Sequence, residues 1–178
     1  MRKEATAGLL ATAALCSILA SPASACPGAD QPPGTQSSDD TRLSVTCLIN
    51  EQRRRHHLHN VRPNIDLGVA AQGHSNAMVA GNFFSHGGDG TLESRAANAG
   101  YLAGARAWGL GENLEWGIGR AGTPRSMVRR WMHSPEHRNV MLSRQFRQIG
   151  IGVFNGAPIP GDNPGSETYT AMFGYRKG

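Results

Sequence analysis

The chain has few of the features that mark membrane-spanning or nucleic-acid-binding proteins. Beyond residue 25, no apolar run approaches the roughly 20 residues that a helix needs to cross a bilayer. Aromatic residues make up only 6% of the 178 residues, and none interleave with the densest basic stretch, Arg53 to Arg55, as a base-stacking surface requires. We therefore interpret Arg53 to Arg55 as a solvated helix end. We expect no nucleic-acid partner and no transmembrane segment after signal cleavage.

Common catalytic signatures are also absent. The sequence contains neither His-Glu-x-x-His nor Gly-x-Ser-x-Gly, and no nucleophile with a recognisable partner base. What it does have is an excess of arginine, which contributes most of the positive charge behind a net charge of +5. Such a charge favours anionic partners, for example cell-wall polymers or lipid headgroups, and composition alone does not choose between them.

The first 25 residues predict export. Arg2 and Lys3 precede an almost wholly apolar stretch at residues 7–20, and the small residues at positions 21–25 suit a signal peptidase. The apolar stretch is shorter than the roughly 20 residues of a membrane-spanning helix. We therefore interpret residues 1–25 as a secretory signal peptide, which predicts a secreted, extracellular protein.

Cysteine is scarce, and the signal peptide would remove one of the three, Cys16. Cys26 and Cys47 then remain as a pair in a compartment that allows oxidation, which predicts a disulfide. Closing this loop would stabilise the fold by about 3 kcal/mol in the chain-entropy model. The alternative is a lipid anchor on Cys26, because positions 23–26 faintly resemble a lipoprotein box, although Ala23 stands where that box usually has leucine.

The remaining chain divides into an N-terminal arm, residues 26–40, and one domain, residues 41–178. The arm is rich in Pro, Gly, Ser, Gln and Asp and has almost nothing to bury, so we expect it to be mobile. Apolar residues at steps of three and four, with capping residues, predict four helices in the domain. They are expected over residues 43–58, 67–81, 91–100 and 123–134, and Pro135 is expected to stop the last. His74 lies on the apolar stripe of the second helix, which favours a hydrogen-bonded core histidine.

The C-terminal third changes to a period of two residues, which is typical of strands. Residues 149–153 and 169–173 alternate in this way, and residues 109–116 predict a third strand. Gly150 and Gly152 fill one face of their strand, which indicates that another backbone packs very close to it. Helices first and strands late predict a layered α/β domain.

Short polar segments at the edges of these elements carry a resemblance to a known family. They are Phe83-Phe84-Ser85-His86, Gly111-Glu112-Asn113-Leu114 and Trp131-Met132-His133-Ser134-Pro135-Glu136-His137-Arg138, together with Leu48-Ile49-Asn50-Glu51 and Gln148-Ile149-Gly150-Ile151-Gly152-Val153. In this order and spacing they resemble the CAP superfamily, also called the SCP-like or cysteine-rich secretory protein family, and in particular its small bacterial secreted branch. The resemblance covers roughly residues 43–175.

This resemblance implies an α-β-α three-layer sandwich with a large open cleft. By position, His86 matches the family's first histidine, Glu112 the acid of its Gly-Glu-Asn motif and His137 its second histidine. In several members these groups hold a divalent metal, and two neutral imidazoles with a carboxylate suit zinc or a similar ion. The resemblance therefore predicts His86, Glu112 and His137 as metal ligands, with one divalent ion such as zinc as the candidate cofactor.

The same resemblance places Trp131, Asn113 and Ser134 at the cleft. Ser134 stands where many eukaryotic members have a second glutamate, one helical turn after the tryptophan. Glu136 is nearby, but the turn at Pro135 is expected to aim it elsewhere. The set of titratable cleft residues known in the family is therefore incomplete in this chain.

Three functions compete. The favoured one is a secreted, non-enzymatic domain that binds a lipid, a peptide or an envelope component in its cleft, since family members include sterol and lipid binders, toxins and defence proteins. The alternative is a metal-assisted, peptidase-like hydrolase, in which His86 and His137 hold the metal and Glu112 takes a proton from its bound water. The third is an electrostatic adhesin for anionic envelope polymers, based on the arginines.

Overall fold

A computed structural model describes residues 26–178, so the predicted signal peptide lies outside the described residues. All four predicted helices and all three predicted strands are present, and the strands are longer than the sequence pattern indicated. In chain order the elements are α1 (Ser38–Arg55), β1 (Arg62–Pro63), α2 (Ile65–Gly81), α3 (Leu92–Asn98), β2 (Ala107–Ile118), the 3-10 turn η1 (Gly119–Gly122), α4 (Pro124–His133), α5 (Pro135–Met141), β3 (Gln148–Asn155) and β4 (Ser166–Lys177). Within residues 26–178, no helix combines the length and apolarity needed to cross a membrane.

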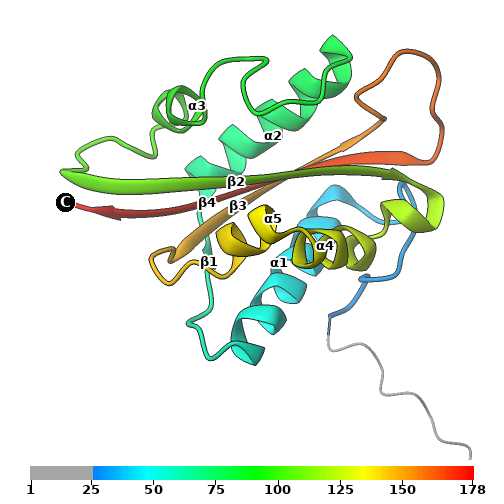
Figure 1. Cartoon of the computed structure of the whole chain (residues 1–178). Helices are drawn as coiled ribbons and strands as arrows, with labels where there is room; N and C mark the ends of the chain where they lie inside the picture. The colour runs from blue at the N-terminus through cyan, green and yellow to red at the C-terminus, as the bar shows by residue number, and fades with distance from the viewer. Residues whose placement is uncertain (1–25) are drawn as a thin grey trace, which may run out of the picture.

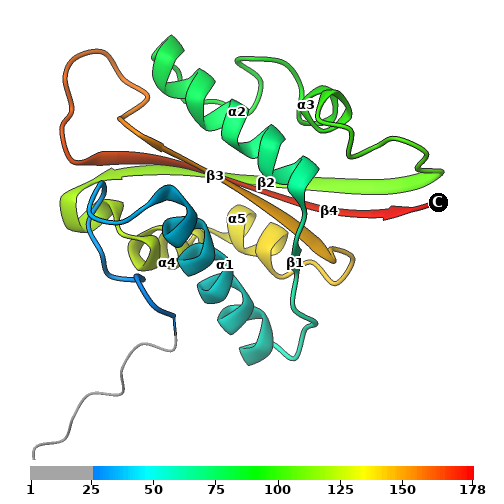
Figure 2. The same ribbon diagram turned by 180° about the vertical axis from the view of Figure 1, so that it is seen from behind.

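A four-stranded sheet of order β1-β3-β4-β2 forms the middle layer. Strands β2 and β3 both pair antiparallel with β4, and the short β1 pairs parallel with the start of β3. Helices α2 and α3 cover one face of the sheet, and α1, α4 and α5 cover the other (Figures 1 and 2). This arrangement confirms the predicted α-β-α sandwich.

Each face of the sheet buries its own apolar cluster. The cluster under α1, α4 and α5 includes Trp131 and Phe173, and the smaller cluster under α2 and α3 includes Leu67 and Met172. Met172 and Phe173 are neighbours on β4, so successive side chains of this strand enter opposite clusters. Strand β4 is therefore buried on both faces and forms the centre of the domain.

Helix α2 packs directly against β3 because two glycines leave room for its backbone. A Cβ atom built on Gly150 would lie 2.1 Å from the carbonyl carbon of Leu67, and one on Gly152 would lie 2.1 Å from the carbonyl oxygen of Ala71. Any larger side chain at either position would push the helix away from the sheet. The close backbone contact predicted from the glycine pattern is confirmed.

The N-terminal segment differs from the mobile arm expected on composition. Cys26 and Ala29 are buried, and the Cys26–Cys47 disulfide confirms the predicted pairing. Arg125 of α4 donates its Nε to Asp30 at 2.7 Å and its backbone N–H to the carbonyl of Ala29 at 2.9 Å. A covalent bond and polar contacts hold this segment, neither of which its low apolar content reveals. A Cys26 sulfur bonded to Cys47 also has no thiol left for a lipid, so the two alternatives exclude each other.

Two helix ends also differ from expectation. Helix α1 begins at Ser38, ahead of the predicted range of residues 43–58, because the Ser37 side chain accepts a hydrogen bond from the Asp40 N–H at 3.1 Å. Pro135 does end α4, but it also begins α5, since a proline in the first turn loses no helical hydrogen bond. The second helix of this pair therefore carries His137.

The basic stretch at the end of α1 is only partly solvated. Arg54 and Arg55 are exposed as predicted, but Arg53 is fully buried. Its guanidinium donates to four backbone carbonyls, those of His59, Met141, Ser143 and Phe146. Arg53 thus ties the end of α1 to the segment that joins α5 to β3, and the prediction of a solvated side chain was wrong for this residue.

The close packing of α2 on β3 can be tested by two glycine substitutions. Gly152→Ala should lower the free energy of unfolding by about 3 kcal/mol, because its new methyl group overlaps backbone atoms. Gly73→Ala, on α2 with nothing within 4 Å of the new methyl, should raise it by about 1 kcal/mol through helix propensity. Urea denaturation followed by circular dichroism measures both, and equal effects of the two substitutions would contradict the close contact.

Candidate functional site

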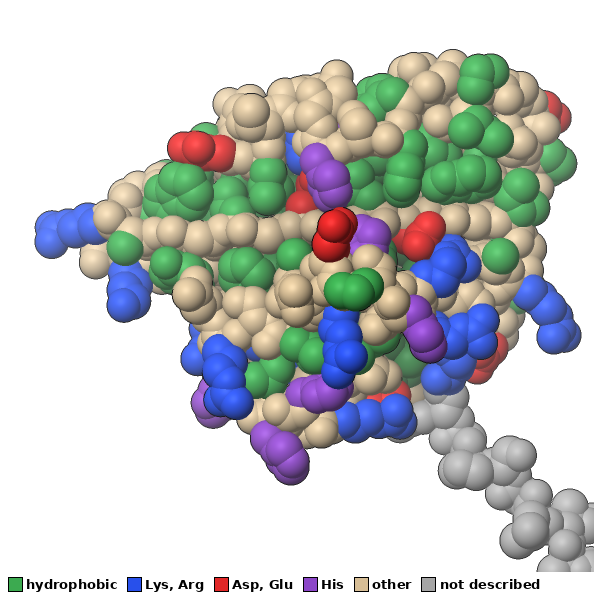
Figure 3. Space-filling model, in the orientation of Figure 1, with side chains coloured by type: hydrophobic (Ala, Val, Ile, Leu, Met, Phe, Trp, Pro, Cys, Tyr) green, Lys and Arg blue, Asp and Glu red, His purple; other side chains and the backbone are tan. Residues whose placement is uncertain are grey.

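Histidine and acidic side chains gather near the centre of one face of the molecule (Figure 3). The group is built around Glu112, which lies on β2 opposite Met172 and has only 2% of its side chain exposed. A carboxylate buried this far needs a charged partner. Arg95 of α3 is that partner, because its Nη2 donates to Glu112 Oε1 at 3.0 Å and to Oε2 at 2.8 Å.

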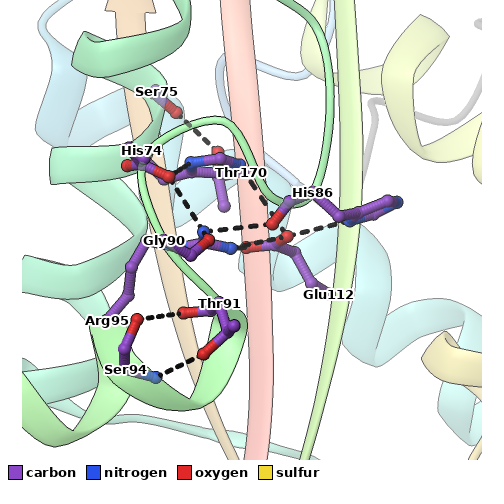
Figure 4. A network of polar contacts seen from close by, with 10 residues as sticks. His74, Ser75, His86, Gly90, Thr91, Ser94, Arg95, Glu112 and Thr170 are labelled. Carbon is purple, nitrogen blue, oxygen red and sulfur yellow. Dashed lines mark hydrogen bonds and ion pairs between the residues drawn. The ribbon is translucent and has the colours of Figure 1, made fainter.

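Arg95 also organises the loop between α2 and α3. Its Nη1 donates to Asp89 Oδ1 at 2.9 Å and to the backbone carbonyls of Gly90 and His86 at 2.7 and 3.1 Å (Figure 4). One guanidinium therefore binds both the carboxylate of Glu112 and the backbone of the loop that carries His86. The position of His86 depends on Arg95 as well as on its own side-chain contact.

His74 of α2 lies at the inner end of this network. It is fully buried, its Nδ1 lies 2.7 Å from Asp89 Oδ1, and its Nε2 lies 3.8 Å from Glu112 Oε1. These contacts confirm the predicted hydrogen-bonded core histidine. A cavity of about 280 Å³, lined in part by His74, Asp89 and Arg95, opens beside the network on the side of α2 and α3.

His86 lies at the outer end of the network. Its Nδ1 is 2.8 Å from Glu112 Oε1, while 60% of its side chain is exposed. The hydrogen bond to Glu112 raises the pKa of His86 above its ordinary value, although partial burial and the charge of Arg95 act in the opposite direction. The imidazole points away from Arg95 (Figure 4). His86 therefore has one ring nitrogen held by the protein and the rest of its ring open to solvent.

His137 of α5 is half-buried, and its burial lowers its pKa below the ordinary value. The charge of Glu115 raises this pKa and that of His86 lowers it further, which places the two histidines within electrostatic reach of each other. The Asn113 side chain donates to the backbone carbonyl of His137 at 2.9 Å. This bond ties the start of α5 to β2, directly beside Glu112.

The three predicted metal ligands meet on this face, but they do not form a ligand set. Within residues 26–178, no group of three His, Cys, Asp or Glu side chains is arranged to hold a metal ion. Both oxygens of Glu112 are hydrogen-bonded by Arg95 or His86, and the guanidinium already balances the carboxylate charge. Glu112 therefore does not fit the role of a metal ligand, and we derive no step through a metal.

The residues expected at the cleft have structural contacts. Trp131 and Asn113 are fully buried, and Trp131 Nε1 donates to the carbonyl of Leu114 at 3.0 Å, which covers part of the free edge of β2. Ser134 is the N-cap residue of α5 and also ends α4. Together these residues attach α4 and α5 to β2 and so determine where His137 lies.

Arg95 and Asp89 hold the network together, and neither was predicted from the sequence. Thr91, the first residue of the predicted third helix, is the N-cap of α3, and its side chain accepts a hydrogen bond from the Ser94 N–H at 3.0 Å. The available signal was Arg95 itself, a charged residue followed directly by two alanines in a short helix, at a position between His86 and Glu112 in the chain. That pattern does not reveal that the arginine is buried.

These features define a three-layer α-β-α domain in which a glutamate on an edge strand is hydrogen-bonded to a loop histidine. The model of the CAP family, described as the cysteine-rich secretory protein family, matches residues 47–163, and the chain belongs to this family. The resemblance found in the sequence is thereby confirmed. No curated protein sequence is significantly similar to the chain.

Solved structures from three bacteria share the fold. An extracellular protein containing an SCP domain from Bacillus anthracis is 26% identical, with a TM-score of 0.61 over 79% of this chain and 44% of that protein. An outer surface protein from Borrelia burgdorferi is 18% identical, with a TM-score of 0.61 over 75% of this chain and 90% of that one. A cysteine-rich secretory protein from Staphylococcus aureus is 17% identical, with a TM-score of 0.58 over 78% and 39% of the two chains. This chain thus spans less than half the length of the Bacillus and Staphylococcus proteins.

The pKa of His86 should respond in opposite directions to the loss of its two charged neighbours. Glu112→Gln removes the hydrogen-bonded carboxylate and should lower this pKa, whereas Arg95→Gln removes a nearby cation and should raise it. Each substitution breaks a buried ion pair, so we also expect the free energy of unfolding to fall by about 3 kcal/mol. NMR titration of the His86 ring protons and urea denaturation measure these effects. A raised pKa in Glu112→Gln would contradict the assignment.

The stability of the protein should also depend on the protonation of His86. Because folding raises the pKa of His86, the stabilising contribution is present below the ordinary value of 6.5 and is lost as the pH rises through the pKa of the folded state. The difference in unfolding free energy between wild type and His86→Gln should therefore shrink with increasing pH. Urea denaturation of both proteins at a series of pH values measures this difference, and a difference that grows as the pH rises would contradict the prediction.

Proposed function

We propose that this chain is an extracellular binding domain that recognises a polar ligand at His86 and His137. The observation that carries the proposal is the state of His86, which is 60% exposed although its Nδ1 is held at 2.8 Å by a buried carboxylate. An exposed side chain that only served the fold would not need a fixed ring orientation. A fixed and accessible imidazole suits recognition, because little conformational entropy is lost when a ligand binds.

The two histidines offer complementary hydrogen-bonding groups. The hydrogen bond to Glu112 raises the pKa of His86, and burial lowers that of His137. At a pH near 6.5, His86 is therefore the more protonated of the two and favours donating a hydrogen bond, whereas His137 is the less protonated and favours accepting one. A ligand with a hydrogen-bond acceptor for His86 and a donor for His137, such as a peptide or an acylated wall sugar, matches this pair.

Three observations support an extracellular location. The pattern of residues 1–25 is that of an export signal, the disulfide between Cys26 and Cys47 suits an oxidising compartment, and the similar structures include an extracellular protein and an outer surface protein. Each agrees with a secreted domain that meets its ligand outside the cell.

The hydrolase alternative finds no support in the geometry of Glu112. A general base needs a free carboxylate oxygen that faces a water molecule. Both oxygens of Glu112 are bound by Arg95 or His86, and 2% of the side chain is exposed. We therefore propose binding without catalysis as the role of this site.

The proposal can be tested with muramyl dipeptide, a soluble probe that carries both peptide amides and an acetylated amino sugar. Isothermal titration calorimetry of the mature domain should show binding that weakens about tenfold in His86→Ala and in His137→Ala, because each loses one hydrogen bond to the ligand. The control is His133→Ala, which removes an exposed histidine of α4 and should bind as the wild type does.

Two further measurements distinguish the alternatives. Zinc titrated into the same samples tests whether His86 and His137 bind a metal, and dialysis against a chelator tests whether probe binding requires one. The proposal would be overturned if the probe binds equally to wild type, His86→Ala and His137→Ala, or if it is turned over in a reaction that chelation abolishes.

A further inference from the structure

The largest cavity among those described lies at the end of the sheet where β1 and β3 begin and β4 ends. Its volume is about 990 Å³. Its lining consists of Asn50, His59, Asn60, Val61, Arg62, Pro63, Arg147, Gln148, Tyr175 and Arg176. Three of these residues are arginines and none is an aspartate or glutamate. The cavity shares no residue with the site at His86 and His137.

The pairing of the strands places the three arginines together. Arg62 pairs with Gln148 in the register of β1 and β3, and Gln148 pairs with Gly174 in the register of β3 and β4. The backbone N–H of Arg62 donates to the carbonyl of Arg147 at 2.9 Å. Arg176 follows Gly174 by two residues on the same strand. The arginines thus come from three adjacent chain segments whose positions are fixed by the sheet.

None of the three arginines is neutralised within the described part of the chain. The ion pairs there involve other residues. Arg176 donates to the carbonyl of Tyr101 at 2.8 Å, and its guanidinium lies 5.3 Å from the centre of the Tyr101 ring. Arg147 donates to the carbonyls of Arg144 and Phe146. These contacts orient the guanidinium groups of Arg147 and Arg176 and do not compensate their charge.

A fourth arginine adds to the same positive field from inside the protein. Arg53 is fully buried, and its hydrogen-bond partners in the described part of the chain are all neutral backbone carbonyls. Burial lowers the pKa of Arg53, and the charge of Arg147 lowers it further, which shows that the two guanidinium groups interact. A buried cation without a counter-ion is costly unless an anion lies nearby. An anion in the cavity would interact favourably with both.

We propose that this cavity is a binding site for a multivalent phosphate anion, namely the phosphate groups of a linear soluble chain. Guanidinium groups match the oxygens of phosphate with paired hydrogen bonds. The volume of about 990 Å³ accommodates more than a single phosphate group. The three arginines are exposed and line a concave surface, which a flexible chain of phosphate groups can follow. The site lies apart from the proposed function and does not depend on it.

The test uses sodium tripolyphosphate as the probe, with the mature domain at constant ionic strength. Isothermal titration calorimetry should detect binding to the wild type, and Arg62→Gln/Arg147→Gln should bind about tenfold more weakly. The control Arg120→Gln/Arg129→Gln removes two charges from η1 and α4, which line a separate pocket that shares no residue with this cavity, and should change the affinity less than about twofold. Far-UV circular dichroism and thermal unfolding establish that all three proteins are folded.

Two further experiments distinguish a soluble phosphate chain from the phosphate headgroups of a lipid membrane. Soluble poly(glycerol phosphate) should compete with tripolyphosphate, and vesicles of phosphatidylglycerol should not bind the domain. Equal weakening in the cavity variant and the control, no binding to the wild type, or binding to vesicles but not to soluble phosphates would overturn the proposal. His86→Ala should bind tripolyphosphate as the wild type does, so this test and that of the proposed function can fail separately.

Discussion

The buried ion pair between Arg95 and Glu112 is the interaction on which the candidate site depends. Glu112 lies in the interior, where an isolated carboxylate would not stay charged, and Arg95 contacts both of its oxygens at 3.0 and 2.8 Å. Once this pair is formed, Glu112 holds the ring of His86, and Arg95 holds the backbone of the same residue and the side chain of Asp89. This one ion pair thereby connects strand β2, helix α3 and the loop between α2 and α3.

The two buried arginines, Arg95 and Arg53, differ in how their positive charge is stabilised in the interior. Arg95 forms ion pairs with the carboxylates of Glu112 and Asp89, so its positive charge is compensated and it orders the polar groups next to it. Arg53 is bound only by backbone carbonyls, so its hydrogen bonds are satisfied while its charge is not balanced. The arrangement of Arg95 suits a fixed recognition site. That of Arg53 leaves a positive potential at the end of the sheet, which attracts anions.

The sequence predicted the layers well because periodicity reports which face of each element is buried. The glycines of β3, the caps of α3 and α4 and the cysteine pair are all local signals, and the structure contains each of them. Buried charges are different, because their partners are distant in the chain: Arg53 reaches Met141, 88 residues away, and Arg95 reaches Glu112. Composition likewise missed the anchoring of residues 26–37, which depends on one disulfide and a few polar contacts. Pro135 was ambiguous, since a proline that ends one helix also suits the first turn of the next.

The role of Glu112 shows why a residue can match a family motif and still have other chemistry. By position it is the acid of the Gly-Glu-Asn motif, but a carboxylate whose two oxygens are already bound by Arg95 and His86 would have to give up these contacts to bind a metal. The resulting loss includes the buried ion pair itself, which leaves Arg95 with Asp89 as its remaining charged partner. The contacts of Glu112 with Arg95 and His86 therefore order His86, and the same contacts occupy the oxygens that a metal would need. A neutralised carboxylate that fixes an exposed histidine fits recognition better than catalysis, because it orients a group without offering a free base.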